Sequence, residues 1–206
     1  MQQEAKMIDR MALSGTRTFP TVLKFTDIRS YIFTTAFILL SVSVPWVFHQ
    51  FHLAGPTFLP MHIFILAAGL LFGWRAGLVV GLFTPLASYT LSGMPDLLIL
   101  PQIVIELSAY GFIAGILREK LNLRVIWALL GAMVFGRLVL LLIIWVVFLA
   151  SGESYSTLGL ESNPILALWS TTRQSWPGIA IHIAFIPVIV FLVEKHVIKN
   201  TPSRYE

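Results

Sequence analysis

The stretch that most constrains this chain is residues 125–152, where Arg137 is the one ionisable side chain. A second long stretch, residues 31–117, carries only three charged residues, Arg75, Asp96 and Glu106. A helix that crosses the hydrocarbon core needs about 20 mostly apolar residues, so the chain contains several such helices. Only 12% of the residues are charged, about half the share in soluble domains. These features exclude a soluble enzyme, a nucleic-acid-binding domain and a disordered tail.

Six transmembrane helices are predicted, which makes the fold class an all-α integral membrane protein. The apolar runs cover about residues 31–48, 61–92, 97–117, 125–150 and 164–193. As one helix, residues 61–92 would be about 48 Å long, far beyond a hydrocarbon core of about 30 Å. We therefore expect a turn at residues 73–76 and two short helices, which either cross a thinned region of the membrane or begin, for the first of them, before Pro60.

The last apolar run is predicted to be interrupted. The polar residues 171–175 and the Pro177-Gly178 pair indicate a break, so residues 164–175 are expected to form a short or re-entrant helix. Residues 176–193 would then be the sixth span.

The distribution of lysine and arginine predicts that both termini are cytoplasmic. With six spans, twelve of the fourteen basic residues lie on the side of the termini, where the positive-inside rule places them. Arg173 is the one basic residue in an outer loop. The predicted organisation is a cytoplasmic N-terminal extension (residues 1–29), a six-helix membrane domain (residues 30–195) and a cytoplasmic tail (residues 196–206).

Several kinds of chemistry have no candidate residues in this sequence. The absence of cysteine excludes disulfides and thiolate metal sites. Motifs for a Walker P-loop, a zinc protease or a serine hydrolase are also missing. We therefore expect no metal, no cofactor and no ATP hydrolysis by the chain itself.

Three ionisable residues, Glu106, Arg137 and His182, fall near the middle of predicted spans. Unpaired charge at that depth costs at least about 2.5–3.5 kcal/mol, so these side chains should face one another or a wet cavity. They could form the polar floor of an outward-facing ligand pocket. Alternatively, Glu106 and Arg137 form an ion pair that only joins helices, and His182 is a hydrogen-bonded core residue.

A second group of candidate binding residues gathers at the predicted outer face. Its principal members are His62, Ser88, Tyr89, Met94, Arg173 and Trp176. Aromatic and methionine surfaces with a few polar groups suit a small organic ligand, although tryptophan and tyrosine also collect at membrane interfaces. Arg173 could bind an anionic ligand group or pair with Glu153 or Glu161. Together with Arg137 it would suit a carboxylate.

Glycines recur every four residues at 69, 73, 77 and 81, and again at 111 and 115. Small residues at this spacing let helices approach closely. We interpret them as packing residues, with the regularity of the first series partly fortuitous because the predicted turn divides it.

An ordered set of short motifs resembles a known family. It comprises Pro60-Met61-His62-Ile63, Gly93-Met94-Pro95, Glu106-Leu107-Ser108-Ala109-Tyr110-Gly111, Gly136-Arg137, Trp176-Pro177-Gly178-Ile179 and Ile186-Pro187. The set resembles the substrate-binding S component of energy-coupling-factor (ECF) vitamin transporters, nearest the branch that contains pantothenate and cobalamin binders. The resemblance covers roughly residues 30–195.

The resemblance implies a membrane subunit that captures a vitamin from outside without catalysis of its own. It implies two kinds of partner in the prokaryotic cytoplasmic membrane, a transmembrane coupling protein and two ATP-binding-cassette ATPases. The family pocket would fall on Met94, Glu106, Tyr110, Arg137 and Trp176. A docking pair of small residues on the first helix would correspond to the register of Thr35 and Leu39, where Leu39 is bulky, and glutamine is expected where His182 stands.

Two other functions compete with this one. A small intramembrane enzyme could use Glu106, His182 or His62 for acid–base chemistry on a lipid, but it would need a closely spaced catalytic pair. A structural scaffold of the envelope would need no pocket and would tolerate loss of Glu106 and Arg137.

Overall fold

The computed structural model describes residues 28–50 and 55–193. Residues 1–27 of the predicted N-terminal extension, and the predicted C-terminal tail, lie outside the described residues. The helices are α2 (Ile28–Gln50), α3 (Gly55–Phe58), α4 (Pro60–Phe72), α5 (Trp74–Ser92), α6 (Leu100–Glu119), α7 (Val125–Ser151) and α8 (Pro164–Val193). Two short strands, β1 (Ser154–Ser156) and β2 (Gly159–Glu161), lie between α7 and α8.

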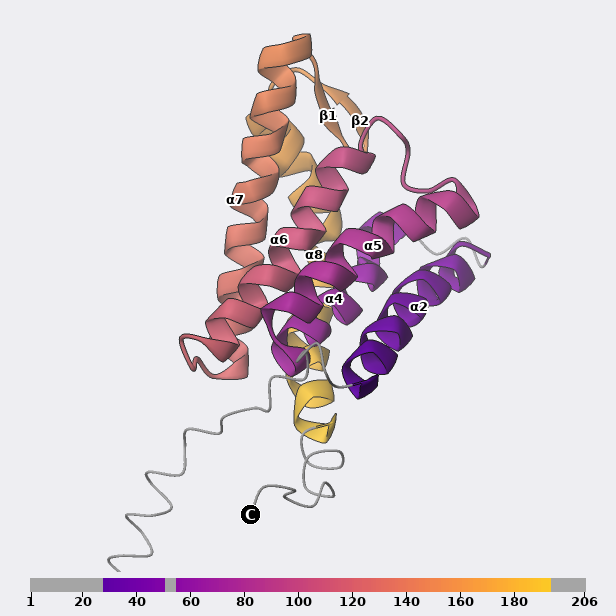
Figure 1. The fold of residues 1–206 in the computed structure, drawn as a ribbon. Helices are drawn as coiled ribbons and strands as arrows, with labels where there is room; N and C mark the ends of the chain where they lie inside the picture. Colours follow the sequence, from indigo (N-terminus) through magenta and orange to yellow (C-terminus); the bar gives the residue numbers. More distant parts are fainter. Residues whose placement is uncertain (1–27, 51–54, 194–206) are drawn as a thin grey trace, which may run out of the picture.

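The helices form one bundle with two distinguishable ends (Figure 1). The β1–β2 hairpin lies at one end, which we call the hairpin end. The beginning of α2, the end of α8 and the α6–α7 connection lie at the opposite end. That end carries Arg75, Arg118, Lys120 and Arg124 on or beside its turns, and we call it the basic end.

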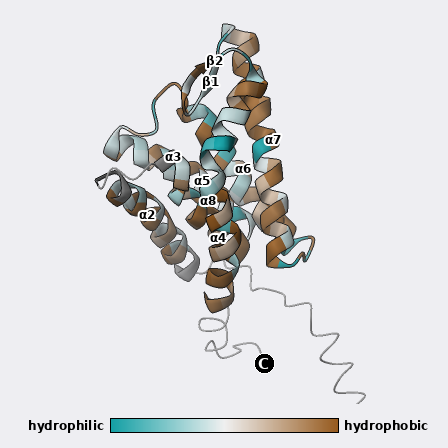
Figure 2. Ribbon diagram, turned by 180° about the vertical axis from the view of Figure 1, so that it is seen from behind, coloured by the Kyte–Doolittle hydropathy of each residue, from teal (hydrophilic) through white to brown (hydrophobic). Residues whose placement is uncertain are grey.

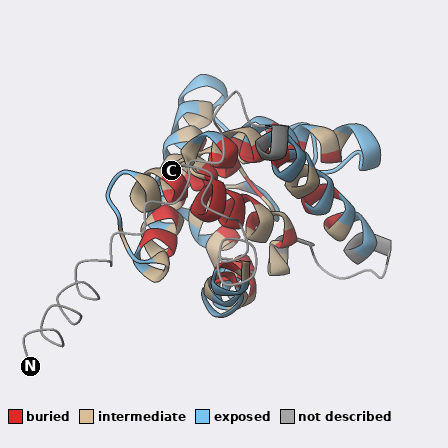
Figure 3. Ribbon diagram, turned by 60° about the horizontal axis from the view of Figure 1, so that its bottom comes forward, coloured by how far each residue is buried: buried red, intermediate tan, exposed pale blue. Residues whose placement is uncertain are grey.

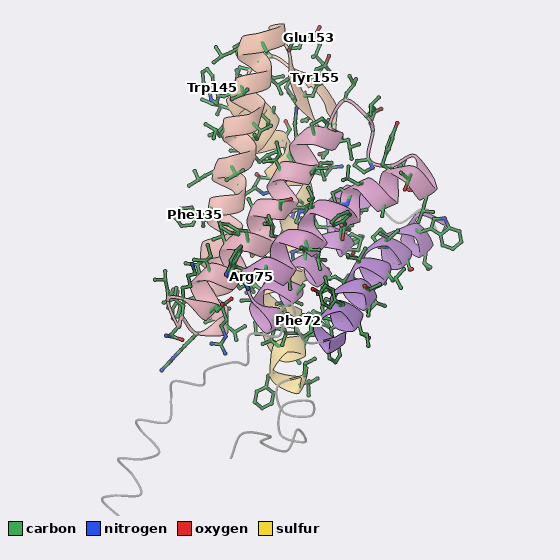
Figure 4. The ribbon with its side chains drawn as sticks, in the orientation of Figure 1. Phe72, Arg75, Phe135, Trp145, Glu153 and Tyr155 are labelled. Atoms are coloured by element: carbon green, nitrogen blue, oxygen red, sulfur yellow. The ribbon has the colours of Figure 1, made fainter. Side chains whose placement is uncertain are left out.

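Three helices, α6, α7 and α8, are long and apolar enough to cross a membrane on their own. The apolar segments Tyr31–Val47 in α2 and Pro60–Phe72 in α4 are shorter. Figure 2 shows apolar residues (brown) along most of α7, and hydrophilic residues (teal) part-way along α6 and α7. Phe135 and Trp145 project outward from α7 (Figure 4) and are 50% and 42% exposed, as expected of side chains that face lipid.

The predicted break in residues 61–92 is confirmed. Helix α4 ends at Phe72, Gly73 takes a positive φ of 87°, and α5 begins at Trp74. The Trp74 backbone N–H donates to Glu119 Oε2 at 3.3 Å, so a carboxylate from α6 lies at the positive end of the α5 dipole. The first helix does not extend back through Pro60, because Leu59 adopts a left-handed conformation (φ 50°, ψ 48°) that separates α3 from α4.

The predicted interruption of the last run is wrong, since α8 is continuous over residues 164–193. The polar residues that suggested a loop, Thr171 and Ser175, are buried and face the bundle. Ser175 Oγ also donates to the Thr171 carbonyl at 2.8 Å within the helix. Pro177 is tolerated inside α8 because neighbouring helices and hydroxyl side chains can compensate a lost backbone hydrogen bond in membrane proteins.

A row of glycines, which we call the glycine seam, brings α4, α5 and α6 into backbone contact. Its members are Gly69, Gly77, Gly81, Gly111 and Gly115. A Cβ atom on Gly69 or on Gly77 would collide with the Gly111 carbonyl, and one on Gly115 would collide with the backbone of Trp74. The packing interpretation is therefore confirmed. The series is not fortuitous, because glycines on both sides of the break converge on one residue of α6.

Buried residues gather in the middle of the bundle (Figure 3), and α4 has ten buried residues among its thirteen. The short length of α4 is thus accommodated in the protein interior, where irregular backbone at membrane depth is tolerated. The β1–β2 hairpin departs from an all-α fold. Thr157 Oγ1, in its turn, donates to Gln174 Oε1 of α8 at 2.7 Å.

Candidate functional site

The predicted mid-membrane pair is present. Arg137 Nη1 donates to Glu106 Oε1 at 3.1 Å, and Arg137 Nη2 donates to Ser175 Oγ at 2.7 Å. The side chains of Glu106 and Arg137 are only 6% and 14% exposed. This chain of bonds joins α6, α7 and α8 in the interior of the bundle.

Two histidines from distant parts of the chain complete the same region. His182 on α8 stacks on His62 of α4, with ring centroids 5.9 Å apart and planes at 22°. His62 also contacts Tyr110 of α6 edge-on at 5.3 Å, and Tyr110 lies within interaction range of Glu106 and Arg137. The Tyr110 ring fits against α7 because position 136 is glycine; a Cβ there would collide with the ring.

The Leu59 carbonyl fixes the position and the tautomer of His182. It accepts the His62 backbone N–H at 3.0 Å and lies 3.1 Å from His182 Nε2. A carbonyl can only accept, so Nε2 carries the hydrogen and Nδ1 is left as an acceptor. A left-handed conformation at a non-glycine residue costs roughly 1–2 kcal/mol, and these two bonds help to offset that cost at Leu59. His182 is therefore buried and hydrogen-bonded, which is compatible with both readings of this residue, a core histidine and part of a pocket floor.

One residue of this region was missed by sequence analysis. Gln102 lies one turn before Glu106 on α6 and is 3% exposed, yet its Nε2 has no hydrogen-bond partner. The sequence spacing could have identified Gln102, because residues 102, 106 and 110 are separated by four positions each and therefore share one face of the helix. We call His62, Gln102, Glu106, Tyr110, Arg137, Ser175 and His182 the polar cluster.

The polar cluster contains more hydrogen-bonding atoms than it satisfies. Among the described residues, the buried atoms without a partner include both ring nitrogens of His62, Gln102 Nε2 and Arg137 Nε. Buried polar groups are nearly always hydrogen-bonded, and leaving one unpaired costs about 1–3 kcal/mol. Such a concentration of unpaired atoms in one region suits a site that is completed by water or by a ligand.

The structure divides the predicted outer group. His62, which was expected at the outer face, belongs to the interior cluster. Ser88 is buried, and Ser92 Oγ donates to its carbonyl at 2.7 Å. Tyr89 is half-buried near the end of α5, and within the described part of the chain no hydrogen bond or ring contact joins it to the polar cluster.

Three other predicted residues are exposed. Met94 is 49% exposed, Trp176 is 65% exposed, and Arg173 is also exposed. Among the described residues no ion pair joins Arg173 to either carboxylate of the hairpin. Glu153 instead accepts a hydrogen bond from Tyr155, and Glu161 accepts one from Ser156 at 3.4 Å. The exposure of Trp176 matches the interfacial position considered for the tryptophans.

The fold and the site define an α-helical membrane protein with a buried polar site, one that holds no group of three or more potential metal ligands among the described residues. Residues 28–190 match the model of the family described as ECF transporter, substrate-specific component. The match covers most of the chain, so the protein belongs to this family and is a membrane-embedded transport subunit. No curated protein and no solved structure matches the chain at a significant level.

Proposed function

We propose that the polar cluster binds the transported substrate, a vitamin or a related micronutrient, which is captured from the outer side of the membrane. The observation that supports this most strongly is the set of buried, unpartnered polar atoms on His62, Gln102 and Arg137. A purely structural cluster would gain stability by satisfying them or replacing them with apolar groups.

The hairpin end is the proposed outer end. Arg75, Arg118, Lys120 and Arg124, on or beside the described connections, lie at the opposite end, whereas Arg173 lies within α8 near the hairpin. This distribution agrees with cytoplasmic termini and a six-span arrangement. Under this orientation Gln102, close to the beginning of α6, lies nearest the outer entrance, and Glu106 and Tyr110 follow one and two turns deeper.

The proposed transport step depends on partner subunits. A transmembrane coupling protein and two ATP-binding-cassette ATPases would supply the energy, in the cytoplasmic membrane of a prokaryote. Helix α2 is a candidate docking surface, since Thr35 and Leu39 are exposed there and Leu39 is 62% exposed. The motif resemblance suggests pantothenate and cobalamin as the first compounds to examine.

Two measurements test this function. The protein, purified in detergent, should be stabilised against thermal unfolding by at least one compound of a vitamin panel, since a ligand that binds only the folded state raises its stability. Affinity purification from the native membrane should recover an ATPase-bearing module with the chain. Uptake that persists after deletion of every such ATPase would contradict the coupling, and a reporter fusion placing residues 151–163 in the cytoplasm would contradict the orientation.

A further inference from the structure

The charges of the polar cluster carry information about the ligand. Arg137 is the cluster's one permanently cationic side chain, and its guanidinium is already engaged by Glu106 at 3.1 Å and by Ser175 at 2.7 Å. Only its Nε remains without a partner. The arginine that sequence analysis matched to a carboxylate is therefore paired with a carboxylate of the protein itself.

The other groups of the cluster add no net charge. Gln102, Tyr110 and Ser175 are neutral side chains. We count both imidazoles as neutral, because a charged ring would need a carboxylate of its own and Glu106 is already paired with Arg137. The described cluster thus contains one positive and one negative charge, held together in the interior.

An ion that entered this site would leave an uncompensated charge. Moving a charge from water into the protein interior is unfavourable unless a partner of opposite sign receives it. A carboxylate could accept a hydrogen bond from Arg137 Nε, but it would then share one cation with Glu106, and the interior would carry a net negative charge. An ammonium group that paired with Glu106 would strand Arg137 in the same way.

The unpartnered atoms suit a ligand of a different kind. Gln102 Nε2 and Arg137 Nε are donors only, and the neutral His62 ring offers one donor and one acceptor. The rings of His62, Tyr110 and His182 add flat apolar faces, which favour contact with a planar ring system. A compound with carbonyl oxygens or ring nitrogens would satisfy these donors without bringing a charge.

We infer that the polar cluster selects a ligand whose bound portion is uncharged and rich in hydrogen-bond acceptors, and that the Glu106–Arg137 pair enforces this selection by cancelling its own charge. The inference rests on the proposed function, since it concerns the ligand of the same site. It assigns Glu106 a role in specificity: its carboxylate occupies the place that an anionic ligand would take.

Pairs of compounds that differ only in charge test the inference. Suitable probes are pantothenol and pantothenate, nicotinamide and nicotinate, and biotinamide and biotin, titrated by calorimetry into the full-length protein in detergent. The uncharged member of a bound pair should bind at least about tenfold more tightly than the acid, equivalent to 1.4 kcal/mol. Tighter binding of the acid would overturn the inference while leaving the proposed function intact.

Variants then test the role of Glu106. Glu106→Gln frees the Arg137 guanidinium, so the preference for the uncharged member should shrink by at least about tenfold or reverse. Glu119→Gln removes a carboxylate from the basic end of the same helix and is the matched control; it should leave the preference unchanged. An unchanged preference in a folded Glu106→Gln variant would overturn the inference.

A second variant covers the case in which Glu106→Gln does not fold. In the double variant Glu106→Gln/Arg137→Gln both charges are absent, so the preference for uncharged compounds should remain. If this variant prefers the acid, the inference is overturned.

If the protein binds none of these probe compounds, its ligand can be sought in a bacterial extract. The protein is exposed to the small-molecule fraction of a bacterial extract, and the bound compound is identified by mass spectrometry after denaturation. An uncharged compound supports the inference. An anion or a cation overturns the inference but leaves the proposed function intact. If no small molecule is bound, the proposed function is overturned together with it.

Discussion

Helix α6 has two faces that are built from opposite kinds of residue. One face carries Leu107, Gly111 and Gly115, and its backbone touches α4 and α5 along the glycine seam. The other face carries Gln102, Glu106 and Tyr110, which belong to the polar cluster. Both rows have a spacing of four residues, and they are offset by one position along the helix.

The two faces differ in whether polar atoms are left without a hydrogen-bond partner. The glycine seam brings backbones so close that no Cβ fits, and its stability comes from dense packing. The polar cluster holds an ion pair and several aromatic rings but leaves polar atoms unpaired. Substitutions in the seam should therefore affect folding alone, whereas substitutions in the cluster should separate folding from binding.

The largest effect is expected for Arg137→Ala. Removal of one partner from a buried pair strands the other charge, so we expect a loss of about 3–5 kcal/mol in the free energy of unfolding. Thermal and denaturant unfolding of the purified protein would measure it. The double variant Glu106→Gln/Arg137→Gln should lose clearly less, and an equal loss in both would mean that the pairing is not what stabilises this region.

A smaller loss of stability, about 1–3 kcal/mol, is expected for Gly111→Ala. The new methyl group would meet the Gly77 backbone, which cannot move without separating α5 from α6. Gly131→Ala is the matched control, because there the methyl group meets only the flexible end of Leu117. Similar melting temperatures for the two variants would contradict the close approach in the glycine seam.

A change of affinity without a loss of stability is expected for Gln102→Leu. This change removes a buried amide nitrogen that has no partner, so folding should be unaffected or slightly stabilised. Ligand affinity should fall about tenfold, which corresponds to 1.4 kcal/mol. Ser108→Ala on the same helix also removes a buried, unpartnered polar atom, but one that lies by the glycine seam, so it should bind ligand normally.

The smallest effect concerns the hairpin, outside both faces of α6. Tyr155 donates a hydrogen bond to Glu153 (Figure 4), and this bond to a carboxylate raises the pKa of the Tyr155 phenol above its usual value of about 10. Because the folded pKa is raised, any contribution to stability is fully present below about pH 10 and is lost as the pH rises through the folded pKa.

An absorbance titration of phenolate formation measures this shift. Glu153→Gln should move one phenol back toward its usual pKa and leave ligand binding unchanged. An identical titration curve for the two proteins would contradict the bond.

The lengths of the apolar runs and the spacing of the charged residues were sufficient to predict much of the fold. The break near Gly73 followed from a run too long for the bilayer, and the Glu106–Arg137 pair followed from their matched depth and the cost of isolated charge. Both arguments need only distance along a helix. The continuity of α8 was missed because a polar segment reads as a loop until it is known that Thr171 and Ser175 face inward.

It was harder to predict which residues make up the polar cluster, because this also depends on which side chains face inward. His62 joins the polar cluster because Leu59 turns the chain between α3 and α4, and the bond from His182 to Leu59 spans 123 residues. No local pattern reports such a contact. Gln102 was overlooked because an uncharged amide in an apolar helix attracts less notice than an ionisable residue, although its four-residue spacing to Glu106 pointed to it.

The Glu106–Arg137 pair also bears on how the protein enters the membrane during synthesis. The two residues are 31 positions apart, on consecutive helices joined by a short connection. At about 5–20 residues per second, the ribosome adds the arginine within a few seconds of the glutamate. If α6 and α7 insert as one helical hairpin, neither charge faces lipid alone, and the chain carries its polar site into the bilayer already neutralised.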